Sequence, residues 1–214
     1  MALSEELLLL LDNNEEPLPK RLKIADNAFK SCNLPIQHRE AFLLQWLSKV
    51  SKTNSIDVWN LLLKWLQSVQ IHNLSRSDIS FNDLRNLNNI LSKRLKHTES
   101  SAIVIDCVLE IIQNKNFQVF FKHDLDEHCR FIGIILTKIK CPNQLHKFLS
   151  NEQLFNRNIT SNEDFYKHFI LNTLLPLSTA ISTFHSDKRV FADASKLLQK
   201  CIFERNFKRF SAYF

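Results

Sequence analysis

Residues 81–96 read FNDLRNLNNILSKRLK, and their spacing shows how most of this chain can be interpreted. Leucines stand at positions 84, 87, 91 and 95, three or four residues apart, which is the spacing of one face of an α-helix. The other face carries polar and charged side chains, namely Asn82, Arg85, Asn86, Asn89, Lys93 and Lys96. The pattern therefore predicts a helix that buries one face and exposes the other at a surface.

The chain contains a single glycine, Gly133, among its 214 residues. An average soluble protein of this length would hold roughly fifteen. Tight hairpins, phosphate-binding loops and dinucleotide-binding folds need glycine where the backbone takes a positive φ or approaches a ligand closely. The composition therefore argues against a β-rich protein and against a nucleotide-binding α/β protein, and it predicts an all-α fold.

Apolar residues recur at helical spacing along almost the whole chain. Residues 102–112, AIVIDCVLEII, are apolar nearly all round, which is typical of a helix covered on several sides, although the β-branched run would also suit a strand. Ser80 and Ser161, each followed three residues later by an acid, resemble helix N-caps, and Pro176 should kink or end a helix over 163–184. We predict about nine or ten helices in an irregular α-solenoid of the HEAT or armadillo kind, with an irregular globular bundle as the alternative.

Charge is distributed unevenly along the chain. Residues 1–16 contain five acids and no base, whereas the rest of the chain carries all 28 Lys and Arg against 17 acids, a net charge of +11. We expect residues 1–18 to form an acidic, partly flexible segment and residues 19–214 to form one helical repeat-like domain. A stripe of phenylalanines from Phe203 to Phe214 stops in mid-pattern, which predicts that this domain is the N-terminal part of a longer array.

The sequence contains no motif typical of a catalytic or metal site. Walker loops and nucleophile elbows need several glycines, and only Gly133 is present. His123 and His128 are five residues apart, which points them in different directions on a helix, so we expect solvated surface histidines rather than metal ligands. Cys107 lies in an apolar pattern and is expected to be a buried thiol. We therefore predict no metal, no cofactor, no small-molecule substrate and no enzymatic activity.

The five cysteines and the hydropathy of the chain bear on its surroundings. An odd number of widely spaced cysteines without a C-x-x-C pair favours a reducing compartment. No apolar stretch approaches the ~20 residues that cross a bilayer, and the leucine run at 7–11 lacks the basic flank of a secretory signal. The sequence therefore predicts an intracellular protein that is not inserted in a membrane.

Basic residues are the candidates for function. Lys20, Arg21 and Lys23 follow two prolines and resemble a nuclear-import tetrapeptide, although they would equally form the basic first turn of a helix. The excess of bases favours an acidic partner, either RNA or an acidic protein surface. The candidate contact residues are Lys93, Arg94, Lys96, Lys188, Arg189, Lys196, Lys200, Arg205, Lys208 and Arg209.

The segment KRLKIADNAFKSCNLPIQHREAFLLQWLSKV, residues 20–50, resembles the start of the second "unhealthy ribosome biogenesis" family of nucleolar proteins. The similar features are a lysine-rich helix with Leu22, Ala25 and Phe29, a break at Leu34-Pro35, and a helix ending in Leu43-Leu44-x-Trp46. The helix of Trp59 and residues 188–214 look like later N-terminal helices of the same proteins. Family members are several times longer than this chain and have a C-terminal region that it lacks.

The resemblance implies a non-enzymatic helical-repeat scaffold in the nucleus and nucleolus. Its partners would be other assembly factors on precursor large-subunit particles, with contact to pre-rRNA as a further expectation and a connection to rRNA processing. The resemblance carries over no catalytic residues. The alternative that the residues leave open is a generic intracellular helical adaptor for protein–protein interaction, unrelated to ribosomes.

Overall fold

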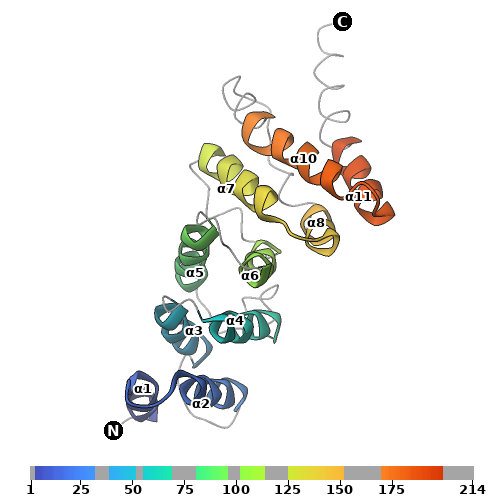
Figure 1. The fold of residues 1–214 in the computed structure, drawn as a ribbon. Coiled ribbons are helices and arrows are strands. Elements are labelled where there is room, and N and C mark those ends of the chain that lie inside the picture. The colour runs from blue at the N-terminus through green and yellow to red at the C-terminus, as the bar shows by residue number, and fades with distance from the viewer. Residues whose placement is uncertain are drawn as a thin grey trace, which may run out of the picture. The chain divides into compact units, whose positions relative to one another are not determined.

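A computed structural model describes residues 3–31, 39–51, 55–68, 81–95, 102–113, 125–151 and 170–199. These residues form ten α-helices, one short π-helical segment and no strands, so the predicted all-α fold is confirmed for the described part of the chain (Figure 1). The elements are α1 (Leu3–Asp12), α2 (Leu18–Lys30), α3 (Arg39–Val50), α4 (Ile56–Ser68), α5 (Phe81–Leu95), α6 (Ala102–Ile112), α7 (Leu125–Lys138), α8 (Pro142–Leu149), η5 (Ile170–Leu174), α10 (Leu175–Thr183) and α11 (Lys188–Leu198).

The chain divides into two compact units, residues 1–93 and 94–214. The sequence predicts a different division, between an acidic segment 1–18 and a helical domain 19–214, and this division stays a prediction. The leucine stripe predicted for α5 is confirmed at the three positions whose side chains are described, since Leu87, Leu91 and Leu95 are buried. The caps expected at Ser80 and Ser161 and the phenylalanine stripe from Phe203 to Phe214 lie outside the described residues.

In the first unit, α2 packs against α1, α3 and α4, and α3 packs against α4 (Figure 1). The contact between α2 and α4 combines a stacked aromatic pair with side-chain hydrogen bonds. The rings of Phe29 and Trp65 stack with their centroids 4.3 Å apart and their planes within 4° of parallel. Trp59, Leu62 and Leu66 are buried on α4, as their helical spacing predicts. Two helices distant in sequence are thus joined by an aromatic pair inside an apolar core.

The carboxylate of Asp26 accepts hydrogen bonds from side chains of both α2 and α4 at the edge of this core. Asp26 Oδ2 accepts hydrogen bonds from Lys30 Nζ at 2.6 Å and from Lys64 Nζ at 2.8 Å. Its Oδ1 accepts from the indole Nε1 of Trp65 at 3.2 Å. Burial of the carboxyl acts to raise its pKa, but the hydrogen bonds from Lys30, Lys64 and Trp65 outweigh burial, so the pKa of Asp26 lies below its ordinary value.

Replacing Asp26 with asparagine should lower the free energy of unfolding at neutral pH by about 1 kcal/mol, because both lysines are largely exposed and screened. A depressed pKa contributes stability above the ordinary carboxyl pKa of 3.8, and this contribution is lost as pH falls through the lower folded value. The stability difference between wild type and Asp26→Asn should therefore shrink below pH 3.8 in urea titrations.

The matched control is Glu16→Gln, which removes an exposed carboxylate paired with Lys20 four residues later. This variant should change stability very little at any pH, since exposed pairs contribute little. A wild-type advantage over Asp26→Asn that stays constant through the acid range would contradict the assignment of the pKa shift to Asp26.

In the second unit, α8 is packed between α6 and α11 (Figure 1). Towards α6, Gln144 Nε2 donates to the Ala102 carbonyl at 3.1 Å and to Asp106 Oδ1 at 3.0 Å, and Lys147 pairs with Glu110. Seven of the eleven residues of α6 are buried, as predicted from its apolar pattern, and the stretch is a helix rather than a strand. This helix is covered on several sides because its side chains are apolar in nearly every direction.

The single glycine lies where α7 packs against η5 and α10. A Cβ placed on Gly133 would stand 2.0 Å from the carbonyl oxygen of Asn172 and 3.6 Å from Cγ of Pro176. Beside this contact, the hydroxyl of buried Thr173 donates to the Cys129 carbonyl at 3.4 Å. The glycine therefore serves a close helix–helix approach rather than a turn.

Pro176 explains why the carbonyl of Asn172 lacks the hydrogen bond that residue 176 would donate in a regular α-helix. Proline has no amide hydrogen, so it cannot bond to the carbonyl of Asn172, four residues earlier, as a regular α-helix would require. The chain is π-helical over Ile170–Leu174, and α10 begins at Leu175 with the proline in its first turn. The sequence predicts that Pro176 kinks or ends a helix over 163–184. In the described part the chain stays helical on both sides of Pro176 and changes from π-helical to α-helical geometry at Leu175, whereas residues 163–169 lie outside the described residues.

Candidate interaction surface

Helix α11 carries three of the predicted contact residues, Lys188, Arg189 and Lys196, and its buried side fixes their direction. Val190, Ala194 and Leu197 are buried, at the spacing the sequence predicts. The carboxylate of Asp187 caps the helix N-terminus by accepting from the backbone N–H groups of Arg189 and Val190. The remaining sides of α11 therefore face away from the core.

Side-chain contacts hold α11 to α8. Asp193 Oδ2 is hydrogen-bonded to His146 Nδ1, and Arg189 Nη2 donates to Asn143 Oδ1 at 3.1 Å. Arg189 also pairs with Asp187 at 3.1 Å. The hydrogen bond from the Arg189 side chain is the main reason that the pKa of Asp187 is lowered, and the same bond raises the pKa of Arg189. The guanidinium of Arg189 is thus already bonded to Asp187 and Asn143 within the protein.

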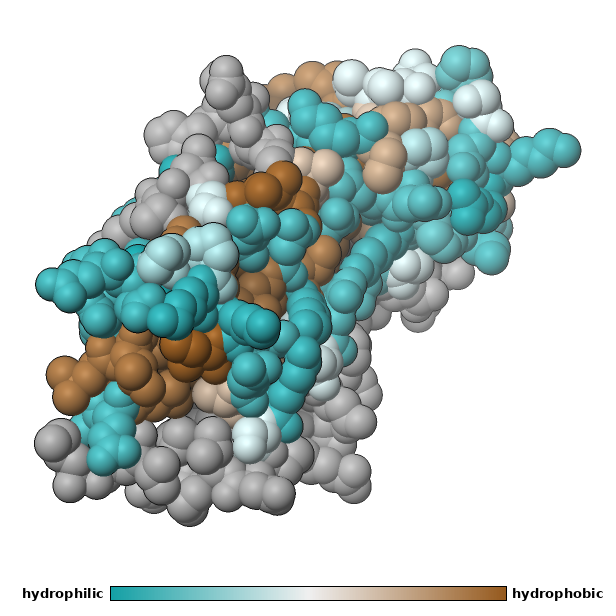
Figure 2. All heavy atoms as spheres, turned by 60° about the horizontal axis from the view of Figure 1, so that its bottom comes forward, coloured by the Kyte–Doolittle hydropathy of each residue, from teal (hydrophilic) through white to brown (hydrophobic). Residues whose placement is uncertain are grey.

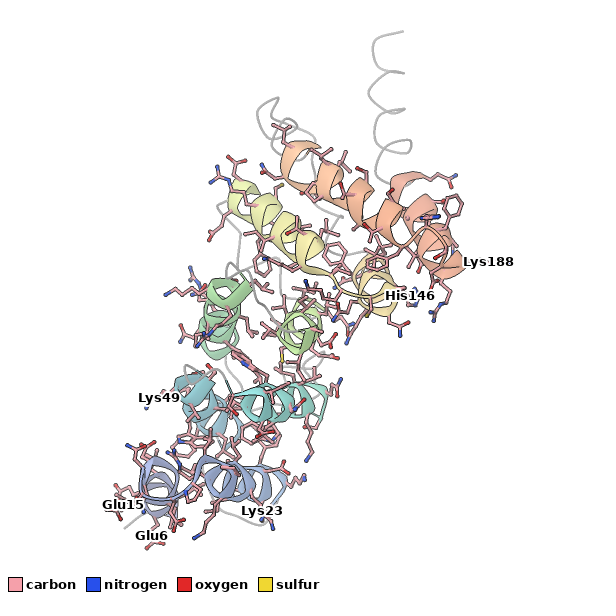
Figure 3. All side chains as sticks on the ribbon, in the orientation of Figure 1. Glu6, Glu15, Lys23, Lys49, His146 and Lys188 are labelled. Carbon is pink, nitrogen blue, oxygen red and sulfur yellow. The ribbon has the colours of Figure 1, made fainter. Side chains whose placement is uncertain are left out.

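Lys188 and Lys196 are exposed and form no salt bridge within the described part of the chain. Figure 3 labels Lys188 on α11 and His146 on the neighbouring α8. The two acids of residues 170–199, Asp187 and Asp193, are both engaged, by Arg189 and His146. Among the described residues 170–199, the outer side of α11 therefore presents positive charge without an exposed acid.

Phe191 is a residue of this surface that the sequence analysis missed. Its side chain is 61% exposed, between Lys188 and Lys196 along the helix. An exposed aromatic ring next to a lysine adds a face for stacking to the basic side of this helix. The signal in the sequence was that Phe191 falls outside the apolar stripe of Val190, Ala194 and Leu197.

The other candidate bases differ in how available they are. Lys93 on α5 is exposed, whereas Arg94 is half-buried and interacts with a neighbouring group. Of these two residues, Lys93 is therefore the better candidate for contact with a partner. The candidates that lie outside the described residues are Lys96, Lys200, Arg205, Lys208 and Arg209.

The candidate import residues lie in the first turns of α2. Arg21 is half-buried, and its Nη1 donates to the Leu11 carbonyl and to Asn14 Oδ1, both at 3.2 Å. Lys20 pairs with Glu16, and Lys23 is exposed. Arg21 therefore stabilises the end of α1. The tetrapeptide forms the first turns of α2, and its role in nuclear import stays a prediction.

The prediction for His128 is wrong, because this histidine is only 3% exposed. The buried side of α7 is wider than a single stripe and includes Phe131, Gly133 and Ile135 as well as Cys129. His123 lies outside the described residues.

Cys107 is a buried thiol, as predicted, and burial raises its pKa well above the ordinary value, with the charge of Asp106 adding to the effect. Such a thiol is a poor nucleophile because the thiolate is the reactive form. Within the described ranges, no three His, Cys, Asp or Glu side chains are grouped to hold a metal ion. None of the helices described is long and apolar enough to cross a bilayer.

Hydrophilic side chains surround hydrophobic patches on the face shown in Figure 2. In the described part of the chain, the large hydrophobic side chains with high exposure are Leu9, Leu10, Ile56, Leu171, Leu175 and Phe191. Phe191 differs from the others in being aromatic and in having, before and after it along its helix, exposed lysines that form no salt bridge with other described residues.

Comparison of the chain with protein-family models, curated proteins and solved structures finds no match.

Proposed function

We propose that this chain is a non-enzymatic scaffold in assembly of the large ribosomal subunit, acting in the nucleolus. It would bind other assembly factors on precursor particles and contact pre-rRNA. The observation that carries the proposal is the resemblance of residues 20–50 to the second "unhealthy ribosome biogenesis" family. Lys188 and Lys196 of α11, which form no salt bridge with other described residues, favour an acidic partner, and RNA in a precursor particle is such a partner.

The packing of the similar segment supports this proposal at the level of fold. Leu22, Ala25 and Phe29 are buried on α2, and Trp46 is buried on α3. The helices end and begin on either side of the break at Leu34-Pro35, since α2 ends at Lys30 and α3 begins at Arg39. The features shared with the family are therefore those that pack consecutive helices together.

We further propose that the helices belong to an irregular α-solenoid. Three observations support this arrangement: consecutive helices pack in pairs, as α1 with α2, α3 with α4 and α10 with α11 do; α6 is apolar nearly all round; and α5 is amphipathic, with its polar side exposed. Stacked helix pairs of this kind expose extended surfaces for partners.

The second candidate function is a helical adaptor for protein–protein interaction without a link to ribosomes. The exposed leucines of α1, Leu9 and Leu10, favour it, since they are apolar groups suited to a protein contact. Purification of the tagged chain from nuclear extract, followed by quantification of the bound RNAs, separates the two. Enrichment of the large-subunit rRNA precursor over the small-subunit precursor would support the scaffold, and equal background levels of both would support the adaptor.

Reversal of charge at one exposed lysine tests the polar side of α5. Lys93→Glu should reduce the recovery of precursor particles in this purification, because it places an acid where a phosphate or an acidic side chain would bind. The helix should remain folded, since Lys93 is exposed. Lys49→Glu, the same change at an exposed lysine of α3, is the matched control. Equal recovery with both variants would remove α5 from the proposed contact surface.

A further inference from the structure

We infer that the outer side of α11 binds single-stranded RNA, with Phe191 stacking on a base and Lys188 and Lys196 contacting phosphates. The inference rests on the proposed function, for which it names the partner class of this helix. Proteins that bind single strands combine exposed aromatic rings with basic side chains that follow the backbone. Both features occur together here, because Phe191 is 61% exposed and the two lysines are exposed without salt bridges in the described part of the chain.

The spacing on the helix suits such a contact. Lys188 lies three residues before Phe191, nearly one turn, so the two side chains emerge close together on one side of α11. Lys196 lies five residues after Phe191, so it is turned about 140° around the axis from the ring and about 80° from Lys188, about 12 Å along the axis from that lysine. A strand of a few nucleotides crossing the helix would meet the ring and Lys188 together and would reach Lys196 beyond Lys188.

The surroundings of α11 keep this surface electropositive and rigid. Helix α10, which packs beside it, contains no charged residue. The carboxylate of Asp187 is paired with Arg189, and that of Asp193 is hydrogen-bonded to His146 Nδ1 on the side of α11 that contacts α8. These contacts also anchor α11 to α8 and limit the loss of conformational freedom on binding.

A flat ring beside an exposed lysine that forms no salt bridge with other described residues favours RNA over an acidic protein. A nucleotide base stacks on an exposed ring without needing a groove, and every base has a face for stacking. An acidic protein helix would use the lysines but would gain no stacking from Phe191. The two partners therefore predict different responses to the loss of the aromatic ring alone.

The test measures binding of the full chain to a fluorescently labelled oligouridine of roughly 12 nucleotides by anisotropy. Phe191→Ala should weaken binding about 5- to 150-fold, while Phe191→Tyr, which keeps a ring, should retain it. Lys188→Glu combined with Lys196→Glu should weaken binding and should reduce the slope of log K against log salt by about 1.4, the value for two phosphate contacts on a single strand. The controls are Leu175→Ala, which removes an equally exposed apolar side chain, and Lys49→Glu, and both should bind as wild type.

Unchanged binding of oligouridine by Phe191→Ala would overturn the inference. Displacement of the oligouridine by polyglutamate, with no dependence on Phe191, would overturn it in favour of an acidic protein partner. The proposed function fails separately, if wild-type chain is not associated with precursor particles, whatever the result with oligouridine. Circular dichroism of each variant confirms that the helices are intact, as expected for exposed positions.

Discussion

Replacing Gly133 with alanine should destabilise the chain by about 2–3 kcal/mol, as expected when an atom is forced into a packed interface. The added Cβ would lie 2.0 Å from the carbonyl oxygen of Asn172, which belongs to backbone and cannot rotate away as a flexible side chain could. The contact lies in the interior, where neighbouring atoms are closely packed. Relief would require α7 to move away from η5 and α10.

Helix propensity predicts the opposite sign for the same change. Alanine in the middle of a helix is favoured over glycine by about 1 kcal/mol. Urea unfolding followed by far-UV circular dichroism therefore decides between close packing and propensity by the sign of the stability change. Thr137→Ala is the control on the exposed side of α7, and it should change stability by less than about 0.5 kcal/mol.

A second substitution tests the cause. Pro176→Ala restores an amide hydrogen that can bond to the Asn172 carbonyl, and it removes the ring that lies 3.6 Å from the added Cβ. In the Gly133→Ala background it should recover part of the lost stability, a coupling that a double-mutant cycle measures. Stabilisation by Gly133→Ala alone would contradict the close approach of these helices.

Replacing Trp65 with alanine should cost about 3–5 kcal/mol of stability, the largest effect expected in the first unit. This side chain is 1% exposed, stacks on Phe29 and donates its indole N–H to Asp26. Its removal leaves a cavity between α2 and α4 and deprives the carboxylate of one donor.

Trp65→Phe separates the two contributions. It keeps an aromatic ring against Phe29 but removes the hydrogen bond to Asp26, so the loss should be well below that of Trp65→Ala. Ile56→Ala is the matched control on the same helix, because this isoleucine is 60% exposed and its truncation should have little effect. Equal losses for Ile56→Ala and Trp65→Ala would show that Trp65 is not in a packed core.

The parts of the fold that the sequence predicts are those determined by local periodicity. The buried stripe of α5 and the burial of most of α6 are properties of single helices, and each follows from the spacing of apolar residues. The place of Gly133 could not be predicted, because its partner Asn172 is 39 residues away in the sequence and the contact depends on tertiary packing.

The same limit applies to the candidate surface. Sequence alone selects lysines and arginines without showing which are engaged, so Arg21 and Arg189 appeared equivalent to Lys188 until their hydrogen bonds were known. His128 was predicted to be exposed because only one apolar stripe was assigned to α7. The buried side of this helix is wider than that stripe. Phe191 was missed because exposure of an aromatic residue depends on which side of α11 packs against its neighbours.

The measurement that tests the proposed scaffold most directly is sedimentation of the tagged chain from nuclear extract through a density gradient, with and without RNase. The proposal predicts co-migration with precursors of the large subunit, and loss of this co-migration after RNase. Migration of the chain as a free protein at the top of the gradient under both conditions would contradict it.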